Sequence, residues 1–195
     1  LKDPADFAAW QKEVTVYLRA HPTGWQAPAG TYFHKAAPPA ASAKMAAKKV
    51  APPKSGAKQP VAPSPTAFGA GSAVKMPRGV AKGEEFALTL DAGPTPIASV
   101  RIDIPKGSVP AGSAANIATR FGILDAKGKE RAVGFHLADA THREPRYVGS
   151  AELTDINAAW SLKMPDADVH AVWLLDMPVN LKSDEKFVVH FESNA

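Results

Sequence analysis

The sequence predicts a mainly β protein: an antiparallel β-sandwich of about eight strands, preceded by one N-terminal α-helix and a long Ala/Pro/Lys-rich extended linker. Two observations predict the sandwich. From Phe68 onward, apolar residues alternate with polar ones in short runs, and prolines and an Asp-Ala-Lys-Gly turn separate these runs. No interval of helical pattern lies between the runs, which disfavours an alternating α/β architecture.

Composition divides the chain into three parts. Residues 1–35 contain the predicted helix and an anchoring segment, residues 36–66 form the linker, and residues 67–195 form the β-sandwich domain. A chain of 195 residues is long enough for one sizeable domain with appendages.

The helix is expected over residues 4–20, because Pro4 suits a first helical turn and Asp3 can cap it. A single helix of this length is marginal in isolation, so its apolar side is expected to dock on another surface. That surface is either the sheet domain of the same chain or a partner. The apolar residues recur at helical spacing as one stripe: Phe7, Trp10, Val14, Tyr17 and Leu18.

The linker differs in kind from the rest of the chain. Its 31 residues include ten alanines, seven prolines and five lysines, and no acid. Such a segment cannot bury enough apolar surface to offset the entropy of ordering. We expect either a tether or an arm that lies along a partner or an anionic surface, where each lysine near a membrane contributes about 1 kcal/mol. The candidate partner-binding residues are therefore Trp10, Tyr17 and Trp25 with Lys44, Lys48, Lys49, Lys54 and Lys58.

The net charge of +4 belongs to this linker. Of 23 basic residues, five lie in the linker, which leaves 18 against 19 acidic residues in the rest of the chain. The lysines have no interleaved aromatic residues on which bases could stack, so no nucleic-acid partner is expected. The absence of cysteine excludes disulfides, thiolate chemistry and cysteine-bound metal within these residues.

The expected strands are marked by apolar residues at alternate positions. Trp160 and Trp173 are expected to sit within the sheet. Two longer apolar strands are expected at Ile117 to Leu124 and Val169 to Leu175. The alternating sets are Phe86, Leu88 and Leu90; Val100, Ile102 and Ile104; Val133, Phe135 and Leu137; Trp160, Leu162 and Met164; and Phe187, Val189 and Phe191.

The strand order resembles a known family. The run "EEFALTLDAGPTPIASVRIDIPKGSVPAGSAANIATRFGILDAKGK" at 84–129 resembles the galactose-binding-like (discoidin or coagulation-factor type C) jelly roll. The closer similarity is to the version found beside cytochrome-like domains in planctomycete proteins. Its strand motif is matched by "IASVRIDIP" at 97–105, and its later pattern by residues 151–191. The resemblance implies a jelly-roll fold and a non-catalytic module of cytochrome-containing, periplasmic or cell-surface machinery.

The residues indicate no reaction. Carboxylate pairs occur at Glu84-Glu85, Asp166/Asp168 and Asp184-Glu185, all in polar, turn-like stretches where both groups are expected to stay solvated. No histidine pair has metal-ligand spacing, and no serine lies in a nucleophile motif. No enzyme activity, cofactor or metal is therefore expected. The six histidines are His21, His34, His136, His142, His170 and His190.

The leading functional interpretation is a structural subunit that clamps a larger assembly through its helix and arm. Given the resemblance, an extrinsic periplasmic or extracellular subunit of a cytochrome-containing electron-transfer complex is favoured, for example a photosynthetic reaction-centre assembly. Its partners would be other protein subunits, including a c-type cytochrome and membrane proteins, with contact to an anionic membrane surface. Two alternatives stay open: a carbohydrate-binding module, and a virion or surface-layer decoration protein.

Overall fold

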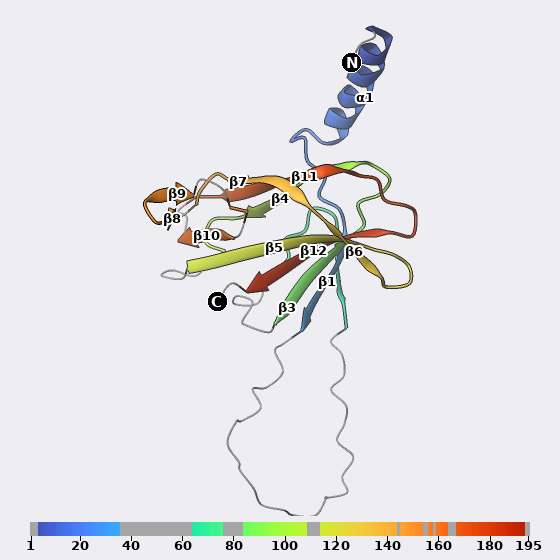
Figure 1. Ribbon diagram of the computed structural model, residues 1–195. Coiled ribbons are helices and arrows are strands. Elements are labelled where there is room, and N and C mark those ends of the chain that lie inside the picture. Colours follow the sequence, from blue (N-terminus) through green and yellow to red (C-terminus); the bar gives the residue numbers. More distant parts are fainter. Residues whose placement is uncertain are drawn as a thin grey trace, which may run out of the picture.

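The computed structural model describes residues 4–35, 64–75, 84–108, 114–143, 145–153, 156–157, 159–163 and 167–193. In these residues the chain is mainly β, with one N-terminal helix and strands paired in antiparallel sheets (Figure 1). The predicted fold class is confirmed at this level. The helix is α1 (Pro4–Ala20), and the strands are β1 (Gly30–Lys35), β2 (Thr66–Phe68), β3 (Glu85–Leu90), β4 (Ile97–Ile104), β5 (Ala114–Leu124), β6 (Glu130–Val133), β7 (Phe135–Ala140), β8 (Arg146–Val148), β9 (Ala151–Leu153), β10 (Trp160–Lys163), β11 (Val169–Val179) and β12 (Lys186–Ser193).

The described strands form three sheets. A seven-stranded sheet has the order β10-β5-β12-β3-β1-β2, with β6 also paired to β5. A three-stranded sheet has the order β4-β11-β7, and β8 and β9 form a separate pair. The ladder between β5 and β12 runs over eight residue pairs without a register shift, from Lys186↔Leu124 to Ser193↔Ile117.

The two larger sheets share one apolar core. Trp160 on β10 and Trp173 on β11 are both buried, and their rings meet edge to face with centroids 6.4 Å apart. Phe121 on β5 also meets Trp173 edge to face, at 5.9 Å. Such aromatic pairs contribute beyond the area that they bury. The prediction that both tryptophans lie within the sheets is therefore confirmed.

One predicted strand is two strands in the structure. The alternating run around Val133 divides at Gly134, so that β6 pairs with β5 in the larger sheet and β7 pairs with β11 in the smaller one. Leu137 belongs to the same alternating set as Val133 and Phe135, yet it is 47% exposed while its neighbour Ala138 is buried. Side chains alternate along a strand, but the pairing of β7 with β11 shifts register between Phe135 and Leu137, which places Ala138 rather than Leu137 on the core side.

Four of the described strands have no counterpart in the sequence prediction: β1, β2, β8 and β9. The most consequential is β1, which lies between β2 and β3 in the larger sheet and pairs with β3 from Gly30↔Leu90 to Lys35↔Glu85. Its sequence, GTYFHK, is short and has no clear alternation of apolar and polar residues. Tertiary pairing, rather than local pattern, places it in the sheet.

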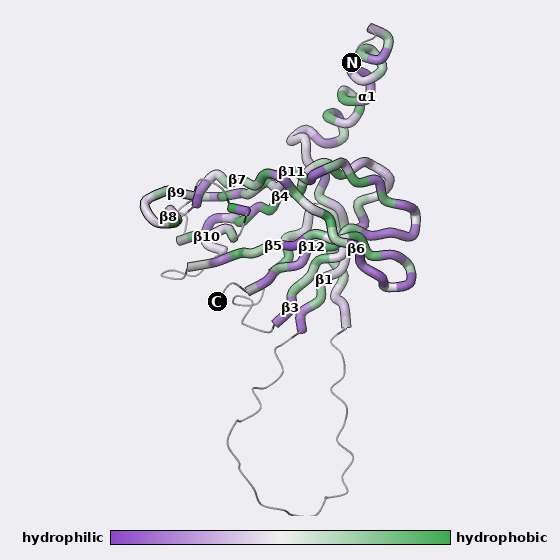
Figure 2. Tube along the Cα trace, in the orientation of Figure 1, coloured by the Kyte–Doolittle hydropathy of each residue, from purple (hydrophilic) through white to green (hydrophobic). Residues whose placement is uncertain are grey.

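The helix has the predicted bounds, Pro4–Ala20, but it does not dock on the sheets of its own chain. No residue of α1 is buried. Figure 1 shows α1 projecting away from the sheets, and Figure 2 shows hydrophobic residues recurring along it. The expectation of docking on the chain's own sheet domain is therefore wrong, and the apolar stripe is left open to solvent.

Candidate functional site

The apolar stripe of α1 is the candidate functional site. Residues three and four positions apart lie on one face of a helix, so Phe7, Trp10 and Val14 line the same side. The rings of Phe7 and Trp10 stack with centroids 5.6 Å apart and planes 27° apart. Phe7 is 45% exposed and Trp10 is 46% exposed, so large apolar area remains in contact with water.

The C-terminal end of α1 and the turn that follows it are held together by short-range contacts. The amide of His21 donates to the carbonyl of Tyr17 at 2.8 Å, and the two rings lie 4.8 Å apart. The Tyr17 hydroxyl donates to the carbonyl of Gly24 at 3.4 Å. Gly24 adopts a φ of 79°, a left-handed conformation that favours glycine and turns the chain out of the helix. These contacts define the end of the helix and the direction in which the chain leaves it.

Trp25 follows this turn and contacts β4. Its ring lies 5.7 Å from the guanidinium of Arg101 on β4, a cation–π contact. Arg101 is held in turn by Asp103, whose Oδ1 accepts from Nε at 2.8 Å and from Nη2 at 2.7 Å. Of the three predicted partner-binding aromatic residues, Tyr17 contacts the turn that ends the helix, and Trp25 contacts Arg101 on β4. Trp10 lies in the exposed stripe.

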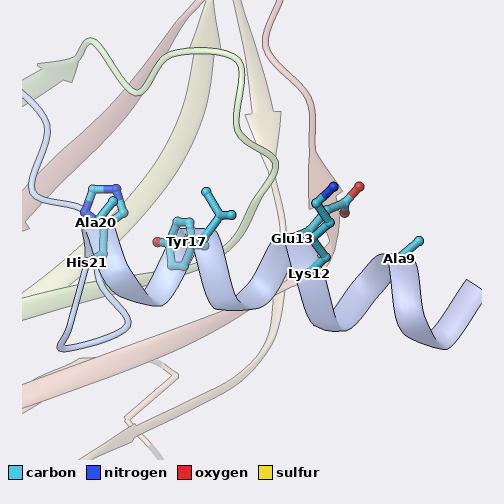
Figure 3. Close-up of a pocket in the computed structure, with 7 residues that line it drawn as sticks. Ala9, Lys12, Glu13, Tyr17, Ala20 and His21 are labelled. Atoms are coloured by element: carbon cyan, nitrogen blue, oxygen red, sulfur yellow. The ribbon is translucent and has the colours of Figure 1, made fainter.

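A neighbouring side of α1, which shares Tyr17 with the stripe, carries a shallow hollow that is open to solvent (Figure 3). Every residue that lines it belongs to α1 or directly follows it, so no strand forms a facing wall. The lining residues are Ala9, Lys12, Glu13, Val16, Tyr17, Ala20 and His21. Both sides of this helix are therefore available, but the aromatic residues Phe7 and Trp10 are confined to the stripe.

The predicted basic arm falls largely outside the described residues. Lys44, Lys48, Lys49, Lys54 and Lys58 all lie in residues 36–63, which the structure does not describe. Their role in binding stays a prediction.

The rings that a carbohydrate site would need are dispersed. Tyr32 packs against the core, with its ring 6.0 Å from that of Phe86. Phe33 follows it on β1 and so points to the other face of the sheet. Tyr147 is exposed on β8, in a different sheet, and Trp25 lies against Arg101. These four residues do not form one aromatic platform.

A polar cluster on the larger sheet was missed by the sequence analysis. His190 on β12 is only 6% exposed, and its Nε2 lies 3.0 Å from both carboxylate oxygens of Glu130. Arg120 on β5 donates from Nη1 to Glu130 Oε1 at 2.6 Å and from Nε to Glu192 Oε1 at 3.3 Å. Glu85 is nearby, with Oε1 at 3.8 Å from His190 Nδ1. The available signal was parity: even-numbered residues of β12 face away from the core.

The electrostatics of the cluster are dominated by its carboxylates. Partial burial lowers the pKa of the Arg120 guanidinium, but hydrogen bonds and charge from Glu130, and then from Glu192, outweigh this and raise the pKa above its ordinary value. Arg120 therefore remains a fixed positive charge between two carboxylates.

The carboxylate pairs expected to be solvated lie in different settings. Glu84 and Glu85 stand at the start of β3, and Glu84 pairs with His34 at 3.5 Å. Glu185 accepts from the amide of Lys182 at 3.0 Å, and Asp168 accepts from the amide of Lys106 at 2.8 Å. These acids hold turns and strand ends in place. Asp166 lies outside the described residues.

Within the described ranges, no three His, Asp or Glu side chains are grouped so as to hold a metal ion. No helix in the same residues has the length and apolar character needed to cross a bilayer. Comparison of the chain with protein-family models, with curated proteins and with solved structures finds no match.

Proposed function

We propose that this protein is a non-catalytic structural or accessory subunit that binds a larger protein assembly through α1, with the Ala/Pro/Lys-rich linker as a second, extended arm. One observation carries the proposal: α1 has an aromatic stripe, yet none of its residues is buried. Large exposed apolar patches on a folded protein commonly mark interaction sites. A helix of 17 residues is also marginal without packing, so binding stabilises it.

In this proposal, the stripe binds in an apolar groove on a partner protein. Helices that bind in grooves present anchors near positions i, i+3, i+7 and beyond, as Phe7, Trp10 and Val14 do. The charged residues of α1 are balanced, with two acids and two bases: Asp6, Glu13, Lys12 and Arg19. Helices that lie on membranes carry a polar face rich in Lys and Arg. The balanced face of α1 therefore favours a protein groove over a lipid surface.

The stripe offers enough energy for a specific contact. Full burial of a large apolar side chain contributes about 1.5–3 kcal/mol, so a half-exposed Phe7 or Leu18 gains on the order of 1 kcal/mol. An aromatic anchor at the centre of an interface costs about 2 kcal/mol or more when it is truncated. For Trp10 this corresponds to a loss of affinity of about 30-fold.

The nature of the assembly rests on the resemblance of residues 84–192. We infer a galactose-binding-like jelly-roll sandwich for the body, and the single core shared by two antiparallel sheets supports this. Because the similar domains stand beside cytochrome-like domains, the proposed setting is an extrinsic periplasmic or extracellular position on a cytochrome-containing electron-transfer complex, such as a photosynthetic reaction-centre assembly. The proposed partners are a c-type cytochrome and membrane-protein subunits.

The test is isolation of the tagged protein from its source in mild detergent, with Trp10→Ala and a matched control, Val16→Ala. Val16 is also exposed but lies outside the stripe, about 120° around the helix from Trp10. We expect wild type and Val16→Ala to bring down the same cytochrome-containing set of subunits in fixed ratio, and Trp10→Ala to retain far less of it. A lone monomer, or equal recovery with all three proteins, contradicts the proposal. If no protein partner is recovered and Trp10→Ala instead loses binding to anionic phospholipid vesicles, the stripe binds lipid rather than a protein groove.

A further inference from the structure

The four charged residues of α1 are not spread evenly around the helix. The surface neighbours of a helical residue lie three and four positions away from it in the sequence. By this spacing Trp10 has two acidic neighbours, Asp6 at i−4 and Glu13 at i+3. The neighbours of Lys12 and Arg19 within α1 all lie outside the stripe: Ala8, Ala9, Thr15 and Val16. The acids therefore border the stripe, and the bases do not.

The angles around the helix axis give the same picture. Each residue advances the helix by about 100°, so Asp6 lies about 40° and Glu13 about 60° from Trp10, both on the same side of it. Lys12 and Arg19 lie about 160° and 180° from Trp10. All four charged side chains are exposed. The stripe thus has an acidic border, formed by Asp6 and Glu13, along one of its two sides, while the bases point away from it.

The stability of the helix alone does not account for this arrangement. Asp6 in the first turn and Arg19 in the last turn complement the helix dipole. Lys12 and Glu13 lie mid-helix, where that effect is weak, and neither has an opposite charge three or four positions away. The ion pairs formed among the described residues include no side chain of α1. The Glu13 carboxylate beside the stripe is therefore available to a partner.

We propose that the partner groove that receives the stripe carries lysine or arginine on the rim that faces Asp6 and Glu13. This inference rests on the proposed function, in which the stripe binds a protein groove. A basic side chain on that rim pairs with Glu13 and lies next to the ring of Trp10, and arginine in particular both pairs with carboxylates and stacks on aromatic rings. The other rim of the groove faces uncharged residues, Gln11 and Thr15, so it needs no charge.

Other occupants of the stripe do not fit its acidic border. In a second copy of α1 the bases also point away from the stripe. Two stripes that pack together would therefore place each acidic border beside another acidic border or beside uncharged residues, and like charges at such positions are unfavourable. An anionic lipid surface would be repelled by Asp6 and Glu13 in the same way, since helices that bind such surfaces place Lys and Arg beside their apolar side.

The test exchanges two neighbouring charges, Lys12→Glu together with Glu13→Lys, which leaves the composition and net charge of the chain unchanged. Lysine and glutamate are both good helix formers, so α1 is retained. The probe is the assembly that is recovered with the wild-type protein and then freed of it, and the association rate of each full-length protein with this assembly is measured. The matched control is Lys12→Glu alone, which has the same acid at position 12 but keeps Glu13.

We expect the exchange to slow association about tenfold at low ionic strength, and added salt to reduce this difference, because charges on the rim of an interface act mainly on the association rate. Lys12→Glu alone should associate no more slowly than wild type. Equal rates for wild type and the exchange variant contradict the basic rim, as does an equal slowing by the control. Faster association of the exchange variant would show that the surface facing the stripe is acidic, which also overturns the inference.

Trp10→Ala separates this inference from the proposed function. If Trp10→Ala loses binding while the exchange variant binds as wild type does, the stripe binds a groove whose rim is not basic, and only this inference fails. If Trp10→Ala binds as wild type does, the proposed function fails and the basic rim fails with it.

Carbodiimide cross-linking of the wild-type complex gives a second readout that needs no substitution. The reagent joins a carboxylate directly to a lysine amine that it contacts. A cross-link from Asp6 or Glu13 to a lysine of the partner, identified by mass spectrometry, supports the inference. Cross-links from these acids to the lysines of residues 36–66 of the same chain, or from Lys12 to a carboxylate of the partner, would overturn it.

Discussion

Trp160→Phe should destabilise the protein substantially, because Trp160 joins the two larger sheets. Its indole Nε1 donates to the carbonyl of His142 at 2.7 Å, and its ring meets that of Trp173 at 6.4 Å. Removing the donor of this part-buried hydrogen bond, together with the contacts of the indole nitrogen, costs about 1–3 kcal/mol. The smaller ring also leaves a void in the core, at about 1 kcal/mol. The free energy of unfolding should therefore fall by about 2–4 kcal/mol.

The assay is urea unfolding followed by far-ultraviolet circular dichroism. With a slope of about 1–3 kcal/mol per molar urea, we expect the midpoint to fall by about 1–2 M with an unchanged slope. Trp25→Phe is the matched control, since it weakens only a partly exposed cation–π contact worth about 0.5–1 kcal/mol. If Trp160→Phe costs no more than Trp25→Phe, the shared core is not organised around Trp160 as described.

Two further predictions use the same unfolding assay. Gly30→Ala should lower the free energy of unfolding by about 2–4 kcal/mol, since a Cβ atom there would lie 2.1 Å from a backbone oxygen of β3. The control, Gly69→Ala, places its Cβ atom 3.4 Å from the nearest atom and should cost less than about 1 kcal/mol. Similar values for the two variants would contradict the pairing of β1 with β3. Phe7→Ala and Trp10→Ala should each change the free energy of unfolding by less than about 0.5 kcal/mol, because no residue of α1 is buried. A loss above about 2 kcal/mol would show that the stripe packs on its own chain.

Elements with strong local signals were predictable. The bounds of α1 follow from the proline at its start, the turn at its end and helical spacing of apolar residues between them. The strands β3, β5 and β12 follow from alternation or from long apolar runs, and they form adjacent strands of the larger sheet. Burial of Trp160 and Trp173 follows from the same patterns.

What depends on distant pairing was not predictable. The alternation around Val133 and Leu137 continues across the point where the chain changes sheets, so it carries no information on which strand each half joins. The cluster at His190 unites residues from β3, β5, β6 and β12, and His190 lies 60 positions from Glu130 in the sequence. Only the register of the ladders, such as His190↔Arg120, brings these polar side chains together.

Whether α1 packs on the sheets of its own chain also could not be predicted from the sequence. An apolar stripe indicates that a helix docks, but it does not identify the surface that the helix binds. In this chain Trp25, which follows the helix, contacts Arg101 on β4, while the stripe itself stays exposed. Under the proposed function, the surface that the stripe binds belongs to a partner protein.

Amide hydrogen exchange over residues 4–20 tests most directly whether α1 is a binding element. In the isolated protein we expect these amides to exchange far faster than those of β12, because an undocked helix opens readily. In the purified assembly they should become protected, and Trp10→Ala should abolish that protection. Protection equal to that of β12 in the isolated protein, or no change on assembly, would contradict a partner-binding role for α1.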